Sequence, residues 1–250
     1  MSAPVLRLEG VSKRFGGLVV TDDVGLDIMP GELHALIGPN GAGKTTLVNQ
    51  IAGQLPSDSG RILFGNEDIT SLPAHARANL GLARTYQITS IISSFTALQN
   101  VALAAQARDG SSFRFFRRVD DDADLNSRAR VVLDDLSLTE RADIPAAQLS
   151  HGEKRIVELA MVLVTKPKLL LLDEPMAGTG REETAKLTQV LQRLKGRLPI
   201  LLVEHDMSVV FSLADVVSVL CFGKVLASAA PAAIRADPRV IAAYLGEEGG

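Results

Sequence analysis

Short apolar runs, separated by glycine turns and amphipathic stretches, are the main pattern along the chain. Apolar strand candidates occur at Leu33–Ile37, Leu169–Asp173 and Ile200–Val203, and the last two are near-continuous aliphatic runs. Such runs are typical of parallel strands that are buried on both faces. A glycine turn after the first run leads into a helical pattern at about 44–52. This alternation of strands and helices predicts an α/β sheet.

Three further stretches have strand or helix patterns. Arg61–Phe64 has the composition of a strand. Glu182–Leu194 places apolar residues at helical spacing and ends near Gly196, which is typical of a helix stop. Val216–Ala227 predicts two short strands that turn at Gly223–Lys224.

The middle of the chain has a different pattern. Residues 91–165 are rich in Ala, Leu and charged side chains and contain no convincing strand pattern, so they predict a helical subdomain inserted into the α/β body. We therefore expect one domain over 1–250, with an α/β core formed by 1–90 and 166–230. Residues 231–250 are expected to form a short C-terminal tail.

Composition and charge narrow the class of protein. Hydrophobic residues make up 46% of the 250 residues, which is ordinary for a globular chain. The net charge of −3 disfavours a nucleic-acid-binding protein, because such proteins are usually basic. The first residues lack a signal-peptide pattern, and no apolar run approaches the roughly 20 residues of a membrane-spanning helix. We expect a soluble chain, which can still dock onto a membrane protein.

One segment of the helical region, SSFRFFRRVDDDAD at Ser111–Asp124, allows two interpretations. Its arginines and phenylalanines are residue types that bind single-stranded nucleic acid. The acidic run beside them cancels their positive field, so this interpretation is disfavoured. The alternative is a surface helix whose phenylalanines pack inward. We favour the helix and expect no nucleic-acid partner.

The strongest motif is a phosphate-binding loop. The segment GPNGAGKT lies between a predicted strand and a predicted helix and matches the P-loop pattern. Glycines let the backbone wrap closely around phosphate oxygens, and the helix N-terminus adds a favourable dipole. Lys44 is expected to reach the β- and γ-phosphates of a nucleotide, and the Thr45 hydroxyl to bind Mg²⁺. The predicted phosphate-binding residues are Gly38, Pro39, Asn40, Gly41, Ala42, Gly43, Lys44, Thr45 and Thr46.

Two acidic residues, Asp173 and Glu174, end the second apolar run. A buried strand that ends in a carboxylate would deliver Asp173 to a metal ion beside the P-loop. Glu174 follows where the chain leaves the sheet and could polarise an attacking water. Two acids after a strand can also form a helix N-cap, but the accompanying P-loop favours the functional interpretation. Together the two motifs predict a nucleoside triphosphatase.

Three further motifs narrow this class. LSHGE at Leu149–Glu153, Gln87 in RTYQ and His205 in VEHDM occur in the order and spacing of the ATP-binding cassette (ABC) family. The chain resembles an ABC transporter ATP-binding subunit over nearly its whole length. The resemblance implies a P-loop NTPase (RecA-like) core with an antiparallel β subdomain and an inserted α-helical subdomain. It also implies that two cassettes enclose two ATP molecules, with the P-loop of one facing the signature turn of the other.

The resemblance assigns roles to the remaining site residues. The signature turn, which would close over the γ-phosphate of the partner's ATP, consists of Ser150, His151, Gly152 and Glu153. Phe15 in KRFGG matches the aromatic that stacks on adenine, with a core phenylalanine as the alternative. Gln87 would contact Mg²⁺ and the attacking water. His205 would hold the γ-phosphate and orient Glu174, with a capping or core histidine as the alternative.

The resemblance and the motifs together give two sets of residues. The predicted catalytic residues are Lys44, Gln87, Glu174 and His205. The predicted metal ligands are Thr45, Gln87 and Asp173. The expected ligands are ATP and Mg²⁺.

Two departures from the general family point to one subgroup. His151 stands where the general family has glycine, and Glu153 stands where it commonly has glutamine. The form LSHGE resembles ABC ATPases that import branched-chain amino acids, as do GLARTYQ and the terminal AAYLGEE. The loop at Pro175–Gly180 lacks the family's usual aspartate, and its Thr179 and Gly180 differ from the Gly-Leu-Asn of that subgroup. This difference bears on communication between the two ATP sites.

We therefore expect the ATP-binding and ATP-hydrolysing subunit of an ABC importer for a small polar solute, branched-chain or other amino acids. The alternatives are transport of urea, other amides or lipopolysaccharide, and a non-transport ABC ATPase in DNA repair or translation. The expected partners are a second copy or a second ABC ATPase subunit, integral membrane permease subunits and, indirectly, a solute-binding protein. The subunit would lie in the cytoplasm against the inner face of the plasma membrane. The apolar stretch near Gln87–Phe95, with Ile91 and Ile92, is expected to contact the permease.

Overall fold

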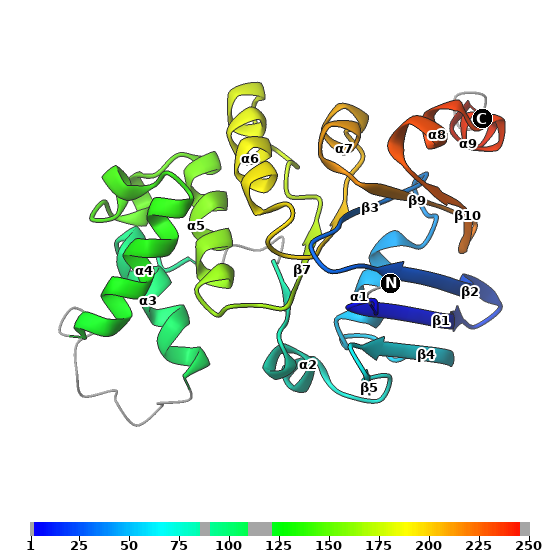
Figure 1. The fold of residues 1–250 in the computed structure, drawn as a ribbon, viewed down its shortest axis with the longest axis horizontal. Helices are drawn as coiled ribbons and strands as arrows, with labels where there is room; N and C mark the ends of the chain where they lie inside the picture. Colours follow the sequence, from blue (N-terminus) through cyan, green and yellow to red (C-terminus); the bar gives the residue numbers. More distant parts are fainter. Residues whose placement is uncertain (1–2, 86–90, 110–121, 246–250) are drawn as a thin grey trace. The chain divides into compact units, whose positions relative to one another are not determined.

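The computed structural model describes residues 3–85, 91–109 and 122–245. The chain forms two compact units (Figure 1). The first unit comprises Met1–Arg84, Lys168–Glu174 and Leu191–Gly250, and the second comprises Thr85–Pro167 and Pro175–Val190. The second unit is thus built from segments inserted between elements of the first.

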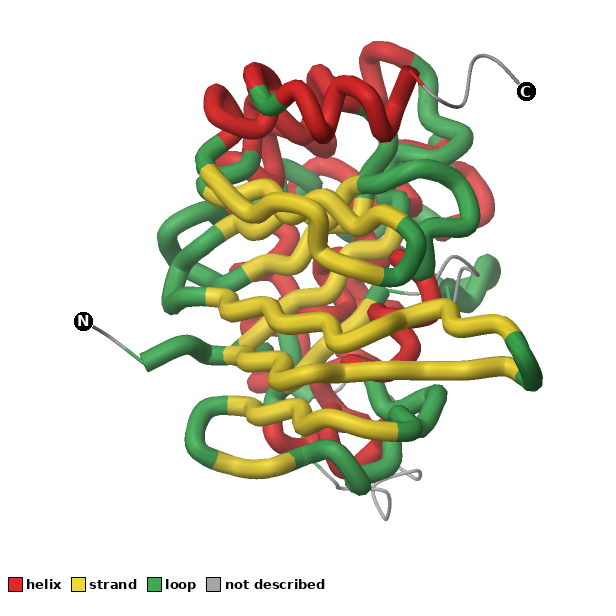
Figure 2. The backbone as a smooth tube through the Cα atoms, turned by 90° about the vertical axis from the view of Figure 1, so that its right-hand side faces the viewer, coloured by secondary structure: helices red, strands yellow, loops and turns green. Residues whose placement is uncertain are grey.

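A six-stranded, mainly parallel sheet forms the centre of the first unit (Figure 2). Its strand order is β10-β9-β3-β8-β7-β6. The strands are β3 (Leu33–Ile37), β6 (Leu82–Arg84), β7 (Leu169–Asp173), β8 (Ile200–Val203), β9 (Val216–Cys221) and β10 (Lys224–Ala229). Neighbouring strands pair in parallel except β9 and β10, which are antiparallel. The strands predicted from apolar runs, β3, β7 and β8, are confirmed, and every residue in them is buried.

A second, antiparallel sheet of the first unit has the order β2-β1-β4-β5. Its strands are β1 (Leu6–Phe15), β2 (Leu18–Ile28), β4 (Ser59–Phe64) and β5 (Glu67–Asp68). The predicted antiparallel subdomain is confirmed, although the apolar pattern predicts only β4. In β1 the pairing register shifts between Leu8 and Val11, on either side of Gly10. Such a shift breaks the period-two alternation, and β1 therefore has no clear strand signal.

Helix α1 (Lys44–Ile51) joins the two sheets through the apolar core. Its buried Leu47 belongs to one cluster with Ile28 of the antiparallel sheet and Leu171 of the parallel sheet. In Figure 1, α1 lies beside β1 and β2. The same core therefore fixes both sheets and the helix that follows the predicted P-loop.

The first unit has further helices besides α1, and Leu80 at the end of one of them packs against this core. They are α2 (Ala74–Leu80), α7 (Met207–Leu213), α8 (Pro231–Ala236) and α9 (Pro238–Leu245). The C-terminal segment thus forms α8 and α9, in which Ile234 and Val240 are buried. Within the described part of the chain, no helix has the length and apolar character needed to span a membrane.

The second unit is helical, as predicted. Its helices are α3 (Ala97–Arg108), α4 (Ala123–Asp135), α5 (His151–Leu163) and the first part of α6 (Arg181–Leu194), with 3-10 turns at Thr139–Arg141 and Ala146–Gln148. Helix α3 packs against α4 and α5. The described residues of this unit contain one isolated β-bridge, between Thr96 and Pro145, and no strand. Most of the basic and aromatic block discussed above lies at 110–121, outside the described residues.

A buried arginine caps the C-terminal end of α1. Arg77 of α2 donates hydrogen bonds to the carbonyl oxygens of Gln50 and Ile51, at 2.7 and 2.8 Å. It also donates to the carbonyl oxygens of Leu72 and Thr70, at 2.8 and 2.9 Å. The last carbonyls of a helix have no partner within the helix, and a cation there also interacts favourably with the helix dipole. Arg77 thus provides hydrogen-bond donors for the last carbonyl groups of α1, the helix that begins at the predicted P-loop.

We predict that Arg77→Met lowers the free energy of unfolding by about 2–4 kcal/mol, because four carbonyl groups, two of them in buried contacts, lose the hydrogen bonds that Arg77 donates. Urea unfolding followed by far-ultraviolet circular dichroism measures this loss. Arg61→Met is the matched control, because the ion pair of Arg61 with Glu9 is exposed and should contribute less than about 1 kcal/mol. Equal effects of the two substitutions would contradict the capping role.

Candidate functional site

The predicted P-loop joins β3 to α1 and is seated on the backbones of two strands. A Cβ atom at Gly38 would lie 2.0 Å from the carbonyl oxygen of Leu220 in β9. At Gly43, where φ is +103°, a Cβ atom would lie 2.4 Å from the carbonyl oxygen of Val20 in β2. No side chain fits at either position, so the loop requires glycine at both for reasons of space alone.

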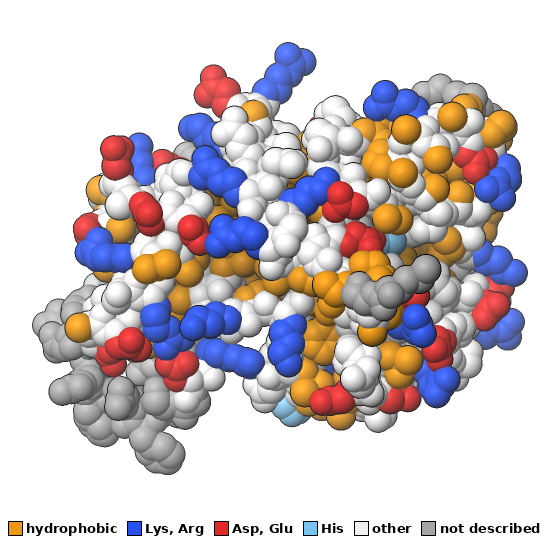
Figure 3. Space-filling view, in the orientation of Figure 1, with side chains coloured by type: hydrophobic (Ala, Val, Ile, Leu, Met, Phe, Trp, Pro, Cys, Tyr) orange, Lys and Arg blue, Asp and Glu red, His pale blue; other side chains and the backbone are white. Residues whose placement is uncertain are grey.

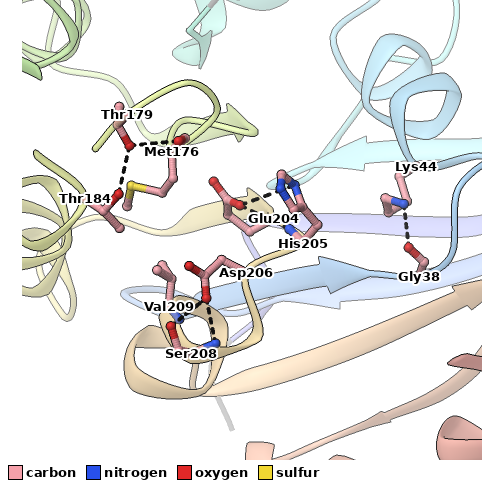
Figure 4. A network of polar contacts seen from close by, with 10 residues as sticks. All are labelled: Gly38, Lys44, Met176, Thr179, Thr184, Glu204, His205, Asp206, Ser208 and Val209. Atoms are coloured by element: carbon pink, nitrogen blue, oxygen red, sulfur yellow. Dashed lines mark hydrogen bonds and ion pairs between the residues drawn. The ribbon is translucent and has the colours of Figure 1, made fainter. Parts of the chain in front are cut away.

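Lys44 folds back onto this loop. Its Nζ atom donates a hydrogen bond to the carbonyl oxygen of Gly38 at 2.6 Å (Figure 4). It also donates to the carbonyl oxygen of Pro39 at 2.8 Å. Gly43 provides no side-chain cap for α1, in contrast to Ser150, whose side chain caps α5. The first turn of α1 therefore has no side-chain cap from Gly43, and helix N-termini bind anions through their amide groups. Thr45 is exposed within this turn.

Asp173, the last residue of β7, forms a buried ion pair with Arg84 of β6. One guanidinium nitrogen of Arg84 donates to Asp173 Oδ2 at 2.8 Å, and another donates to the side-chain oxygens of Asn49 at 2.6 Å and Gln54 at 2.5 Å. The second carboxylate oxygen, Oδ1, is buried and accepts no hydrogen bond from the described residues. Asp173 is thus a fixed strand-end carboxylate with one oxygen still able to bind a ligand, and it does not cap a helix.

Glu174 turns the chain out of the sheet. Its backbone N–H donates to the carbonyl oxygen of Val203 in β8 at 2.9 Å, and its φ angle is +48°. A residue other than glycine in the left-handed region costs conformational energy, and such residues concentrate at functional sites. The strain at Glu174 is therefore held in place by pairing with the neighbouring strand.

The end of β8 carries three polar residues in sequence (Figure 4). The His205 side chain is 68% exposed, and its Nδ1 atom lies 3.8 Å from the buried carboxylate of Glu204. Glu204 also accepts the His205 backbone N–H at 3.1 Å. Asp206 caps α7 through the N–H groups of Ser208 and Val209. The Ser208 hydroxyl lowers the pKa of Asp206. His205 is therefore neither a core residue nor the cap.

These residues follow strands of the parallel sheet at the same edge of that sheet. The order β3-β8-β7-β6 places the carboxyl ends of four parallel strands side by side. The P-loop follows β3, His205 follows β8, and Asp173 and Glu174 end and follow β7. Ligands of open parallel sheets bind at this edge. Gln87 follows β6 in sequence but lies outside the described residues.

Phe15 ends β1 and is 51% exposed, so the alternative of a core phenylalanine is wrong. The Nζ atom of Lys13 lies 5.7 Å from the centre of its ring. An exposed aromatic ring has a free face for stacking, and Phe15 therefore stays a candidate for contact with a nucleotide base.

The predicted signature turn, in the second unit, is the N-terminus of α5. Ser150 is the N-cap: its Oγ atom accepts the N–H of Glu153 at 3.2 Å, and the Glu153 carboxylate accepts the N–H of Ser150 at 2.9 Å. This capping box fixes the first turn of the helix. The N–H of Gly152 donates to Glu183 at 2.8 Å, and His151 is exposed.

The unusual loop before α6 is tied to that helix by a threonine. The Thr179 hydroxyl donates to the carbonyl oxygen of Met176 and is also hydrogen-bonded to the Thr184 hydroxyl, both at 2.8 Å (Figure 4). Gly178 has a φ angle of +76°, which lets the chain turn between them. Thr179 therefore closes the loop on itself without the aspartate that the general family carries.

Family models match two parts of the chain. A model described as "ABC transporter" matches residues 21–177, and one described as "Branched-chain amino acid ATP-binding cassette transporter" matches residues 224–250. The chain belongs to the ABC transporter family. The predicted family and fold class are confirmed.

Individual members of the family match over nearly the whole chain. The high-affinity branched-chain amino acid transport ATP-binding protein LivG of Escherichia coli K12 is 38% identical over 257 residues, covering 99% of this chain and all of LivG. BraF of Pseudomonas aeruginosa, of the same description, is 37% identical with the same coverage. A crystal structure of the ADP conformation of an ATP-binding cassette of an ABC transporter has a TM-score of 0.87 at 29% identity, and the match covers 98% of this chain and all of that chain.

Three acidic or basic residues of this ABC ATPase make contacts that sequence reasoning missed. They are Arg84, Glu183 and Glu204. Arg84 lies within the segment GLARTYQ, and nothing in the sequence pairs it with Asp173. Each contact joins residues far apart in the chain or depends on burial, so none has a local sequence pattern.

We predict that Arg84→Met lowers the free energy of unfolding by about 3–5 kcal/mol, because it leaves Asp173 buried without its counter-charge. The double variant Arg84→Met/Asp173→Leu should recover most of this loss. Urea unfolding measures both. The control is Arg7→Met, which removes an exposed ion pair with Asp27 and should cost less than about 1 kcal/mol. A cost of Arg84→Met no larger than that of the control would show that the buried pair is not needed.

Proposed function

We propose that this ABC ATPase hydrolyses Mg²⁺-bound ATP as one of two paired cassettes and powers the import of branched-chain amino acids. The observation that carries the proposal is the edge of the parallel sheet. There the P-loop, a strand-end aspartate with one oxygen that has no partner among the described residues, a strained glutamate and an exposed histidine follow neighbouring strands. This combination is what phosphoryl transfer to water requires.

The nucleotide would bind through backbone and charge. The amides of the P-loop and of the first turn of α1 would receive the phosphates, with Lys44 supplying the positive charge and Phe15 stacking on the base. The residues present fit Mg²⁺, because protein sites usually hold this ion by one or two oxygen ligands together with phosphates and water. Asp173 Oδ1, buried without a partner among the described residues, and the Thr45 hydroxyl are those ligands, with Gln87 as a third. Bound Mg²⁺ would neutralise charge that develops on the phosphates.

Glu174 and His205 would perform the hydrolytic step. Glu174 would accept hydrogen bonding from the attacking water and orient it toward the γ-phosphate. His205, which is exposed and held beside Glu204, would contact the γ-phosphate and keep Glu174 in position. The role of Lys44 is to stabilise negative charge on the transferred group.

The second cassette supplies the other half of each ATP site. The signature turn Ser150–Glu153 belongs to the second unit, and the family resemblance gives it the γ-phosphate of the partner's ATP. A helix N-terminus with a serine cap and a glycine amide suits an anion. A second copy of this chain, or a related ABC ATPase, would provide the same turn in return.

The transported solute is inferred from the relatives. LivG and BraF are named as branched-chain amino acid transport proteins, and residues 224–250 match the family model of the same description. Membrane permease subunits would hold the pair at the inner face of the membrane. On the face shown in Figure 3 basic and acidic side chains are mixed, which supports the absence of a nucleic-acid partner.

We predict that Glu174→Gln keeps ATP binding but lowers the rate of hydrolysis about 10²-fold or more, because the group that orients the water loses its charge. Lys44→Ala should weaken ATP binding itself. Fluorescent-nucleotide binding and phosphate release measure the two effects. Glu67→Gln, on the exposed strand β5, is the control and should change neither.

The Lys44→Ala preparation also reports contaminating ATPase activity. If purified Glu174→Gln hydrolyses ATP at a near-normal rate above that background, Glu174 is not the residue that orients the water.

We predict that Ile92→Glu spares ATP binding but abolishes co-purification with the permease subunits and the uptake of labelled leucine. Ile92 is 38% exposed, and its backbone is held by the side chain of Asn100. It is therefore a fixed apolar residue at the surface, and a charge there would disrupt a protein interface. Val131→Glu is the control, since Val131 is an exposed apolar residue of α4. Full transport by Ile92→Glu would place the permease contact elsewhere.

A further inference from the structure

One carboxylate lies at the N-termini of two helices in the second unit. Glu183, in the first turn of α6, accepts the N–H of Gly152 through Oε1 at 2.8 Å. Its other oxygen, Oε2, accepts the N–H of Gly180 at 3.3 Å. Gly152 belongs to the first turn of α5, and Gly180 directly precedes α6. Both helix dipoles therefore favour a negative charge at this place.

The hydrogen bonds stabilise the charged form of Glu183. The N–H of Gly152 contributes most to a lowered pKa of this carboxyl group, followed by the N–H of Gly180, and the Ser150 hydroxyl also contributes. The glycine at position 152 makes the approach possible, because a Cβ atom there would lie 2.8 Å from Glu183 Cγ. Glu183 is therefore ionised at neutral pH and held closely against the turn.

Two groups of this turn, the Gly152 N–H and the Ser150 hydroxyl, interact with Glu183. In the proposed function the same two groups face the γ-phosphate of the partner's ATP. An N–H group gives a full hydrogen bond to one acceptor at a time, and two anions a few ångströms apart repel each other. The Glu183 carboxylate and the γ-phosphate of the partner's ATP therefore cannot bind the signature turn at the same time.

We propose that Glu183 is an internal anionic ligand of the signature turn, which the ATP of the partner subunit displaces when the two cassettes close. The inference rests on the proposed pairing of cassettes. Glu183 holds the turn in shape while no phosphate is present, and its displacement opposes closure. Its charge thereby sets how much ATP is needed to form the closed pair.

The experiment compares the double variant Glu174→Gln/Glu183→Gln with the single variant Glu174→Gln, which serves as its parent. Bound ATP is not consumed in either protein. Sedimentation velocity at a series of protein and ATP concentrations measures the dimer dissociation constant. Glu183→Gln keeps the size of the side chain and removes the repulsion, so the constant should fall about tenfold. Glu182→Gln, a neighbouring exposed glutamate of the same helical turn, should leave it unchanged. An unchanged or larger constant for Glu183→Gln would overturn the inference.

A measurement on the isolated subunit separates this inference from the proposed function. The amide signal of Gly152 in a nitrogen-15 NMR spectrum should follow pH with a midpoint below the usual range of a glutamate, because the pKa of Glu183 is lowered. The dependence should vanish in Glu183→Gln. Inorganic phosphate should shift the same signal at lower concentration in Glu183→Gln than in wild type.

The sedimentation measurement and the NMR measurement test different statements, so one can contradict its statement without the other. If the parent never dimerises with ATP, the proposed pairing is wrong, and the Gly152 signal still decides whether Glu183 excludes an anion from the turn. Equal phosphate titrations in wild type and Glu183→Gln would refute that exclusion. Glu183→Asp, which keeps the charge but withdraws it by one methylene, should give intermediate values in both arms and serves if Glu183→Gln does not fold.

Discussion

The P-loop packs directly against the backbones of two strands, and the structure of the first unit depends on this close contact. Gly38 lies against the carbonyl of Leu220 in the parallel sheet, and Gly43 lies against that of Val20 in the antiparallel sheet. The N–H of Gly223 donates to the carbonyl oxygen of Ala42 in the same loop. The loop is therefore the place where the two sheets and α1 meet, and its shape is fixed by packing before any ligand binds.

Two arginines hold the C-terminal part of α1 through hydrogen bonds. A helix of this length is not stable alone in water, so its ends and sides need partners. Arg77 satisfies its last carbonyls, and Arg84 links its Asn49 to the strand-end Asp173. The N-terminal end of α1, which we propose binds phosphate, and Asp173, which we propose binds the metal ion, are thus parts of one hydrogen-bonded framework. Small displacements of α1 cannot occur without disturbing Asp173.

Sequence reasoning succeeded where a local pattern carries the information. Fully buried strands give continuous apolar runs, and the P-loop and the pair Asp173 and Glu174 are contiguous motifs, so their elements were predicted almost residue by residue. Strand β1 was missed because the register shift at Gly10 destroys its alternation. The partners of Arg84 and Glu183 lie far away in the chain or across a turn, and no periodicity reports such contacts. For the same reason no local pattern shows that Ile234 of α8 and Val240 of α9 are buried.

The tip of the hairpin between β9 and β10 is a suitable place for a tryptophan that reports on the P-loop by fluorescence. The sequence contains no tryptophan, so a single introduced indole would be the only one in its emission spectrum. Phe222 at the tip is 90% exposed, and the next residue, Gly223, is hydrogen-bonded both to Ala42 of the P-loop and to Asp22 of β2. A tryptophan in place of Phe222 would thus lie in water, next to the residue whose backbone is hydrogen-bonded to the P-loop. Its fluorescence would follow events in the loop while leaving every polar contact of the loop in place.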